Sequence, residues 1–159
     1  TSYRFWVPEN VAKVYARGIE NHIDAAFVKE NWKVTLSGNY VFTVTTDESE
    51  KAYQQGTNGK QLIYIPRHHA NVFLNTQWKT WNLSYTVEVT GRRSTSYNTQ
   101  EFFAYDLPPY VLHHVALGKQ LKKFRIELRC NNLTDKDYQN VIWRAMPGRS
   151  FAVMGEVRF

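Results

Sequence analysis

The chain has 159 residues, the length of one ordinary domain, with a net charge of +6 at pH 7 and a mean hydropathy of −0.51. Its longest uncharged stretch, Val34 to Thr46, is too short for a membrane-spanning helix, which needs roughly 20 apolar residues. Lysine and arginine are scattered instead of gathered in a patch, which argues against nucleic-acid binding, and the single Cys130 excludes an intrachain disulfide.

Seven segments alternate apolar with polar residues, which is the period of a strand with one apolar and one wet face. One of them is ambiguous, because His113 and His114 put an imidazole on each face. In chain order the predicted strands are Tyr15–Phe27, Trp32–Val44, Ala70–Trp78, Trp81–Thr90, Tyr110–Leu117, Phe124–Asn131 and Ser150–Phe159.

The connections between these segments alternate in length. The short turns are predicted at Lys29–Asn31, Lys79–Thr80 and Gly118–Lys122, and we also assign the lysine cluster Lys119–Lys123 to a turn. The long polar loops are Thr45–Gln61, Gly91–Asp106 and Asn132–Arg149. Short turns at one end and long loops at the other are typical of bacterial outer-membrane barrels, whereas a soluble β-sandwich has no reason to send every long loop to one end. The pattern favours an all-β, antiparallel transmembrane β-barrel.

In such a barrel the last strand runs from the loop end to the short-turn end, so the C-terminus is expected in the periplasm and the loops outside the cell. Counting back through seven strands places the first residue on the loop side. A complete bacterial barrel has an even number of strands and both ends in the periplasm. We therefore expect residues 1–159 to be one part of a larger barrel, with both edge strands hydrogen-bonded to sequence outside this chain.

Four stretches, in order along almost the whole chain, resemble motifs in the C-terminal barrel part of TonB-dependent receptors. Ala16–Glu20 resembles the family's Gly-x-Glu strand opening, and Tyr64–His68 resembles its Tyr-x-Pro-Arg-His entry to a strand pair. Asn131–Tyr138 is similar to the Asn-Leu-Phe-Asp-Lys-x-Tyr motif before the last external loop, with Thr134 in place of the usual Phe. Pro147–Phe151 resembles the motif that opens the last strand.

These motifs also have structural explanations. Pro66 lacks an N–H and belongs at the start of a strand. Asn132 and Asp135 can bond their own backbone and hold a turn. We favour these structural roles over contact with a ligand.

The resemblance implies a barrel of roughly 22 strands with a plugged lumen, of which residues 1–159 supply about seven C-terminal strands. It places the plug, the earlier strands and the TonB contact in the N-terminal remainder of the receptor. The expected partners are this remainder, the TonB complex acting through it, and outer-membrane lipid, with a surface substrate-binding lipoprotein left open. The expected location is the outer membrane of a Gram-negative bacterium.

The resemblance also implies active, TonB-dependent import of a scarce nutrient, either a metal chelate such as a siderophore or haem, or cobalamin. A passive porin is the main alternative, and it would lack the ordered motifs and the plug. An outer-membrane barrel enzyme is disfavoured, because the known hydrolase and phosphate-loop motifs are missing and Asp106 with His113 is the nearest acid–base pair. We expect no cofactor and no catalytic residue.

Alternation assigns each strand residue to a face, and a charge at mid-depth in hydrocarbon costs roughly 2–4 kcal/mol for Arg or Lys. We expect at least one cross-strand Arg–Glu pair on the two final strands, or pairs with the plug. The charged residues expected to face the lumen are Glu20, Glu88, Arg125, Glu127, Arg129, Glu156 and Arg158. The residues expected to face lipid are Trp81, Tyr85, Val87, Phe124, Ile126, Leu128, Phe151, Val153 and Val157.

Aromatic and cationic residues in the loops are candidate contacts for a flat, apolar or anionic ligand. They are Tyr53, Arg92, Arg93, Tyr97, Phe102, Phe103, Trp143 and Arg144. The alternative is that the loop aromatics pack on one another or on a surface partner. Neither His68–His69 nor His113–His114 can clasp one ion, because adjacent strand residues point to opposite faces, so no metal site is expected. Phe159 resembles the C-terminal aromatic by which barrel-assembly machinery recognises its clients.

Overall fold

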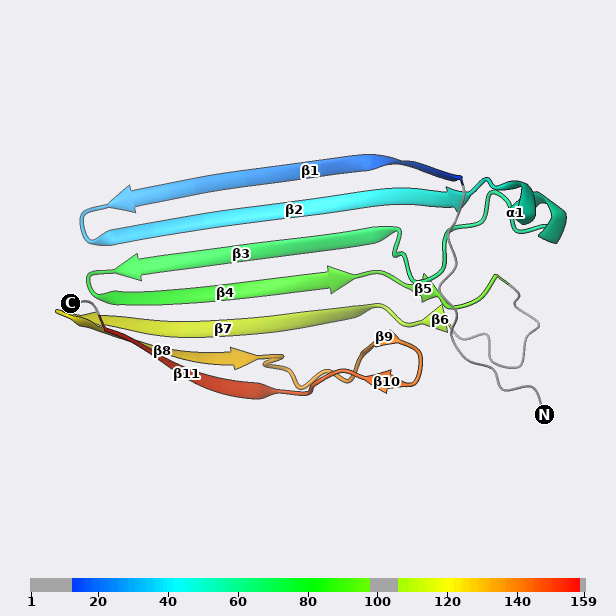
Figure 1. The fold of residues 1–159 in the computed structure, drawn as a ribbon. Coiled ribbons are helices and arrows are strands. Elements are labelled where there is room, and N and C mark those ends of the chain that lie inside the picture. Colours follow the sequence, from blue (N-terminus) through cyan, green and yellow to red (C-terminus); the bar gives the residue numbers. More distant parts are fainter. Residues whose placement is uncertain (1–12, 98–105, 158–159) are drawn as a thin grey trace.

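A computed structural model of the protein describes residues 13–97 and 106–157, which form one long antiparallel sheet with smaller elements at one end (Figure 1). The sheet order is β1-β2-β3-β4-β7-β8-β11, so its strands follow one another in chain order. The strands are β1 (Val14–Lys29), β2 (Trp32–Asp47), β3 (His68–Trp78), β4 (Trp81–Thr90), β7 (Tyr110–Leu121), β8 (Phe124–Asn131) and β11 (Ser150–Val157).

All seven predicted strands are present, and β4 and β8 have the predicted bounds. The predicted turn Gly118–Lys122 is wrong, because β7 continues to Leu121 and the turn contains only Lys122 and Lys123. Gly118 and Lys119 lie directly opposite Glu127 and Ile126 of β8. The hydrogen-bonded ladder therefore extends through residues whose composition alone favours a turn.

The connections alternate as the sequence predicts. Figure 1 shows the three short turns at one end of the sheet and the remaining elements at the other. Glu30 and Lys79, in the first two turns, have positive φ angles of 50° and 52°. This is the conformation of the mirror-type hairpin turns, whose twist matches that of the flanking strands.

The long connections contain short elements that the sequence analysis did not predict. Helix α1 (Glu50–Gln55) is capped at its start by the Ser49 hydroxyl, which accepts a hydrogen bond from the Ala52 amide at 3.2 Å. No helix within residues 13–97 and 106–157 is long and apolar enough to cross a membrane. The other elements are β5 (Arg93–Ser94), β6 (Asp106–Leu107), β9 (Gln139–Val141) and β10 (Arg144–Ala145).

The strand register assigns the side chains to two faces of different chemistry. Leu128 of β8 lies opposite Leu117 of β7 and Val153 of β11, whereas Glu127 lies opposite Gly118 and Met154. All nine residues expected to face lipid share the first, mostly apolar face. The described residues expected to face the lumen, Glu20, Glu88, Arg125, Glu127, Arg129 and Glu156, share the second, polar face, and Arg158 is outside the described residues.

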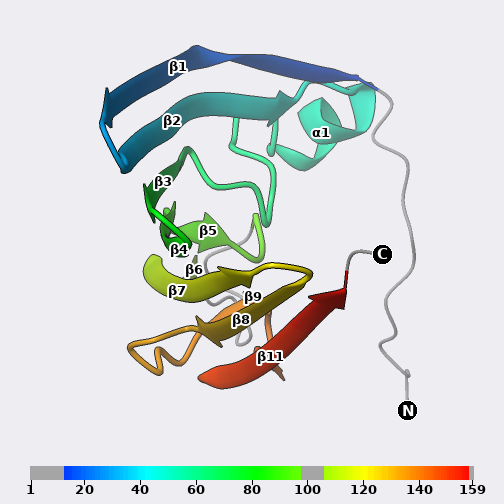
Figure 2. The same ribbon diagram turned by 90° about the vertical axis from the view of Figure 1, so that its left-hand side faces the viewer.

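The sheet is curved, and α1 and β5 lie inside the curve (Figure 2). Thr45, Thr90 and Leu112, all on the polar face, are buried where the loops cover the sheet. The polar face is therefore the concave one. On the convex face 53% of Leu128 is exposed, and only a few apolar residues in the described part of the chain are buried at all. Residues 13–97 and 106–157 thus form one layer, with no second sheet among them against the apolar face, unlike a β-sandwich.

Strands β1 and β11 are the two ends of the sheet order. Within the described residues each pairs with one strand only, β1 with β2 and β11 with β8. The described sheet is therefore open, with a row of backbone groups available for pairing at each edge.

Gly18 supplies a test of the ladder between β1 and β2. A Cβ at this position would clash with the carbonyl oxygen of Phe42, whereas a Cβ at Gly155 of β11 would meet nothing within 4 Å. We expect Gly18→Ala to lower the free energy of unfolding of the full-length protein by roughly 1–3 kcal/mol through overpacking. Gly155→Ala is the control and should cause no loss. Urea unfolding followed by tryptophan fluorescence measures both, and equal losses would contradict the close approach at Gly18.

Candidate functional site

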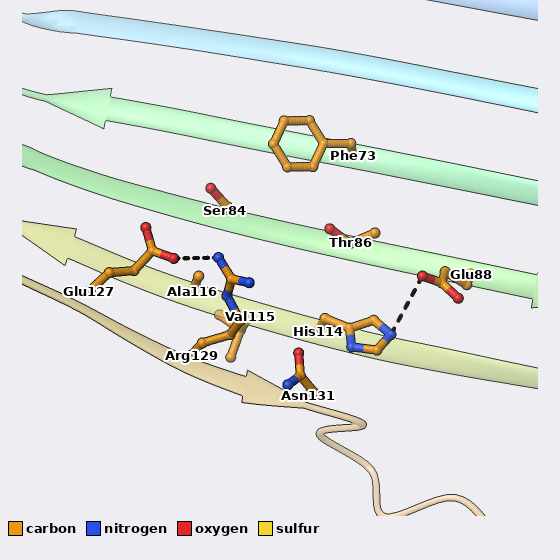
Figure 3. A pocket seen from close by; sticks show the side chains of 10 residues that line it. All are labelled: Phe73, Ser84, Thr86, Glu88, His114, Val115, Ala116, Glu127, Arg129 and Asn131. Carbon is orange, nitrogen blue, oxygen red and sulfur yellow. Dashed lines mark hydrogen bonds and ion pairs between the residues drawn. The ribbon is translucent and has the colours of Figure 1, made fainter. Parts of the chain in front are cut away.

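Side chains of the concave face line a hollow of about 480 Å³ over β3, β4, β7 and β8 (Figure 3). Glu127 is paired twice, with Arg125 at 3.0 Å and with Arg129 at 2.7 Å. Glu88 lies 3.8 Å from Nε2 of His114. Only 16% of the Glu127 side chain is exposed, and the two guanidinium groups offset the cost of removing its charge from water.

The ion pairs of Glu127 run along β8, because Arg125 and Arg129 are its neighbours on the same face two residues away. The sequence analysis expected opposite charges to pair across strands. In the register Arg125 also lies directly opposite Glu156 of β11. Opposite charges therefore face one another across the last two strands, while the arginines contact the carboxylate of their own strand.

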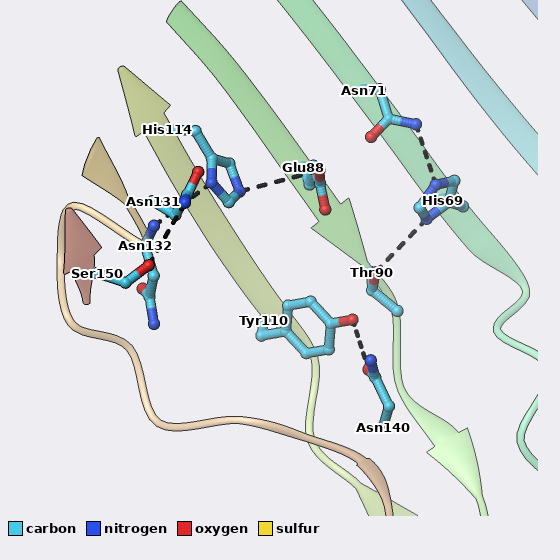
Figure 4. A network of polar contacts seen from close by, with 10 residues as sticks. All are labelled: His69, Asn71, Glu88, Thr90, Tyr110, His114, Asn131, Asn132, Asn140 and Ser150. Carbon is cyan, nitrogen blue, oxygen red and sulfur yellow. Dashed lines mark hydrogen bonds and ion pairs between the residues drawn. The ribbon is translucent and has the colours of Figure 1, made fainter. Parts of the chain in front are cut away.

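A polar network links the ends of the strands to the last long loop (Figure 4). His69 of β3 hydrogen-bonds with Asn71 at 3.1 Å and with Thr90 at 3.5 Å. The backbone amide of Asn132 donates to Nδ1 of His114 at 3.4 Å, and the Tyr110 hydroxyl donates to Oδ1 of Asn140 at 2.8 Å. The network fixes this loop against β7.

Asn132 closes the base of the last loop, as the structural explanation of the motif predicts. It is 3% exposed, its side-chain oxygen accepts from the Lys136 amide at 2.9 Å, and its Nδ2 donates to the carbonyls of Lys136 and Pro147. Asp135 accepts from the amide of Arg149 at 2.7 Å. Residues 132–136 thereby hold residues 147–149, and we name this arrangement the loop clamp.

Arg93 bridges two loops. Its guanidinium stacks over the ring of Tyr110 at 5.2 Å and donates to the carbonyl of Gln139 at 2.8 Å and to Asn140 at 3.3 Å. Arg93 is 5% exposed. A side chain so enclosed holds the loops together instead of presenting its charge to solvent, so its contacts are structural.

The loops enclose a second hollow, which we name the loop pocket. Its volume is about 650 Å³, within the range of small-molecule sites, and apolar or aromatic side chains form much of its wall. The ring of Tyr138 packs at 4.7 Å against that of Tyr110, and burial raises the pKa of Tyr138 above its ordinary value. The pocket is lined by Asp106, Leu107, Pro108, Asp137, Tyr138, Gln139, Ile142, Trp143, Ala145 and Met146.

Of the loop residues named from the sequence, Trp143 alone among those that the structure describes lines the loop pocket. It is 69% exposed and has a φ of 65°, a conformation uncommon for a bulky residue. Arg92 lies beside the pocket, 3.5 Å from the carboxylate of Asp106. Arg144, the residue after Trp143, is the first residue of β10 and is exposed.

The other named residues lie elsewhere. The Tyr53 hydroxyl donates to Glu48 at 3.3 Å in the α1 loop. The carbonyl of Tyr97 accepts from Lys60, and burial raises the pKa of the Tyr97 phenol. Phe102 and Phe103 are outside the described residues, as is Phe159. The sequence analysis missed Tyr138, Ile142 and Met146, although all three are apolar or aromatic residues of a long polar loop.

The histidine pairs are split between the two faces, as expected. His68 hydrogen-bonds with Tyr40 at 2.8 Å and His113 with Tyr85 at 2.7 Å, all on the convex face. Asp106 contacts Arg92 and Ser94, so it and His113 have different partners. Within the described residues, no group of three or more His, Cys, Asp or Glu side chains could hold a metal ion.

A family model described as TonB-dependent receptor-like β-barrel matches residues 1–133. No curated protein matches the chain. Among solved structures, the chain resembles the ferric-catecholate import receptor Fiu of Escherichia coli K12, with 20% identity, a TM-score of 0.70 and coverage of 91% of this chain and 21% of that one.

The ferripyoverdine receptor of the Pseudomonas aeruginosa outer membrane shares 16% identity, with a TM-score of 0.71 and coverage of 91% and 19% of the two chains. The siderophore receptor PiuA of Acinetobacter baumannii shares 16% identity, with a TM-score of 0.68 and coverage of 89% and 21%. The chain therefore spans about a fifth of the length of these receptors. At such identities the likeness concerns the fold.

The loop clamp can be tested at Asn132. Asn132→Ala removes a buried side chain that bonds the Lys136 amide and the carbonyls of Lys136 and Pro147, which should lower the free energy of unfolding by roughly 1–3 kcal/mol. Amide hydrogen exchange in residues 133–149 should rise in the same variant. Asn131→Ala removes a single 3.4 Å hydrogen bond to Ser150 and is the control. Unchanged exchange in Asn132→Ala would show that other contacts hold the loop.

Proposed function

Because this chain belongs to the TonB-dependent receptor-like β-barrel family, we propose that it forms part of the wall and the extracellular loops of an outer-membrane receptor that actively imports a scarce nutrient. The convex face contacts lipid and the concave face lines the lumen. The short turns lie in the periplasm and the loops outside the cell. Other sequence of the receptor pairs with β1 and β11, closes the barrel, and supplies the plug and the contact with TonB.

The distribution of exposure supports this placement. Apolar side chains on the convex face are among the more exposed of the described part, with Ile126 at 46% and Val153 at 73%. Glu127 of the concave face is mostly enclosed. On a soluble protein an apolar surface of this kind would promote aggregation, whereas a membrane barrel needs it to contact lipid.

The loop pocket is the observation that most directly supports the proposal of import. It combines an open apolar wall with the carboxylates of Asp106 and Asp137 and is held in place by Arg93 and the loop clamp. A chelate with apolar or aromatic groups suits its wall. Arg92 neutralises Asp106 at 3.5 Å, so the rim does not repel every anionic ligand.

A ferric siderophore is the substrate class we favour over haem and cobalamin. The solved structures that the chain resembles include a ferric-catecholate receptor, a ferripyoverdine receptor and a siderophore receptor. The iron is cargo held by its own chelator, which agrees with a loop pocket whose wall is largely apolar. A surface lipoprotein that delivers substrate remains a candidate partner at the same loops.

Binding can be tested at Trp143 in the full-length receptor. We expect Trp143→Ala to weaken binding of its ferric siderophore by roughly tenfold, the scale of an aromatic anchor in a pocket. Tyr53 of α1 is an exposed aromatic residue that does not line the loop pocket, so Tyr53→Ala is the control and should leave the Kd within about twofold. Fluorescence quenching by a panel of ferric catecholates, hydroxamates and pyoverdines gives the Kd values.

Transport separates a receptor from a porin. Uptake of radioactive iron by cells should stop when the inner-membrane proton gradient is collapsed, because the outer membrane has no energy source of its own. Uptake that continues at the same rate would identify a passive channel and contradict the proposal.

Neighbouring residues of β2 test the lipid face. Leu36 is on the convex face and Thr35 on the concave face, at nearly the same depth. Leu36→Arg should lower the free energy of unfolding from phospholipid vesicles by about 2–4 kcal/mol, whereas Thr35→Arg should cost much less because its charge remains hydrated in the lumen. The reverse order would show that the faces are assigned the wrong way round.

A further inference from the structure

A row of five side chains crosses the convex face near the short turns. In the strand register Lys29 lies opposite Trp32, Trp32 opposite Trp78, Trp78 opposite Trp81, and Trp81 opposite Lys119. Three tryptophans on adjacent strands are therefore flanked by a lysine at each side. The rings of Trp32 and Trp78 stack with their centroids 5.7 Å apart.

The tryptophans border an apolar groove of about 310 Å³. Their exposed fractions are 47% for Trp32, 40% for Trp78 and 37% for Trp81, so each ring keeps a surface open to the outside. The remaining wall comes from Thr76, Leu83 and Leu117. A groove of this volume and apolar lining suits a hydrocarbon chain.

Ammonium groups stand at the rim of the groove. Nζ of Lys119 is 4.3 Å from the ring centroid of Trp81, and Nζ of Lys79 is 5.2 Å from that of Trp78. Among the described residues neither ammonium forms an ion pair with a carboxylate. Glu30 is the one acidic residue in the adjoining β1–β2 turn, so with Lys29 the rim is net positive.

We propose that this row is a binding site for a phospholipid with an anionic headgroup, in the periplasmic leaflet. One acyl chain occupies the groove against Trp32, Trp78 and Trp81, and the phosphate contacts the ammonium groups of Lys79 and Lys119. The site goes beyond a general aromatic belt, because the register fixes Lys119 and the three rings in one row, Lys79 reaches the Trp78 ring from the adjoining turn, and the groove selects a chain beside a phosphate. The inference rests on the membrane placement proposed above.

Native mass spectrometry of the full-length receptor tests the site, with phosphatidylglycerol and phosphatidylethanolamine as probes. The double variant Lys79→Gln/Lys119→Gln should lose roughly thirtyfold in phosphatidylglycerol binding, since each lysine near an anionic surface contributes about 1 kcal/mol. Its affinity for phosphatidylethanolamine should fall by less than its affinity for phosphatidylglycerol. Lys122→Gln/Lys123→Gln removes the same charge from the neighbouring β7–β8 turn and should change neither affinity by more than about twofold.

Equal losses in the two double variants would overturn the site in favour of general surface charge, and so would an unchanged affinity in Lys79→Gln/Lys119→Gln. Dimers of the receptor that displace lipid from the tryptophan row would overturn it in favour of a second copy. Insertion into vesicles and iron uptake are measured on the same variants. A receptor that inserts and transports without lipid preference refutes only the site, whereas a protein that fails to insert refutes the proposed function.

Discussion

The hydrogen-bonded ladder between neighbouring strands is the constraint on which the rest of this structure depends. Hydrocarbon offers no partner to a backbone N–H or C=O, so a spanning sheet must satisfy these groups internally. Strands that pair in chain order meet this need with two-residue turns at one end. A membrane-spanning strand needs only about 9–11 residues. The 16 residues of β1 and of β2 therefore carry the ladder beyond the bilayer and support the loops.

The same ladder places apolar side chains outside and charged side chains inside, the reverse of a soluble protein. Because successive residues alternate between faces, one register places Leu128 and Val153 outside and Glu127 inside. The charge of Glu127 is paired with Arg125 and Arg129. Arg93 and Asn132 form hydrogen bonds with backbone groups of the loops. These contacts hold the wall and the base of the loops in place, and in the proposed receptor they leave the exposed surface of the loop pocket, with Trp143, for recognition.

Most of the wall could be predicted from the sequence, because a period of two is a local property and every strand displays it. Lys119 was misplaced since its partner in the ladder, Ile126, lies on the next strand and outweighs local turn composition. Helix α1 and the two-residue strands are too short to show a period. Composition also could not reveal that Arg93 is enclosed by Tyr110 and Gln139. The loop pocket depends on contacts between two loops distant in the sequence, so of its lining residues only Trp143 was predicted as a ligand contact.

The loop clamp has a consequence for how such a receptor can change over generations. Asn132 and Asp135 hold Pro147 and Arg149, so the loop leaves and rejoins the wall at a fixed place whatever lies between. Insertions and substitutions at the tip around Val141–Arg144 then leave the register of β8 and β11 intact. In the proposed receptor this tip faces outward. It can diverge around Trp143, which lines the loop pocket, while the wall beneath keeps its sequence pattern.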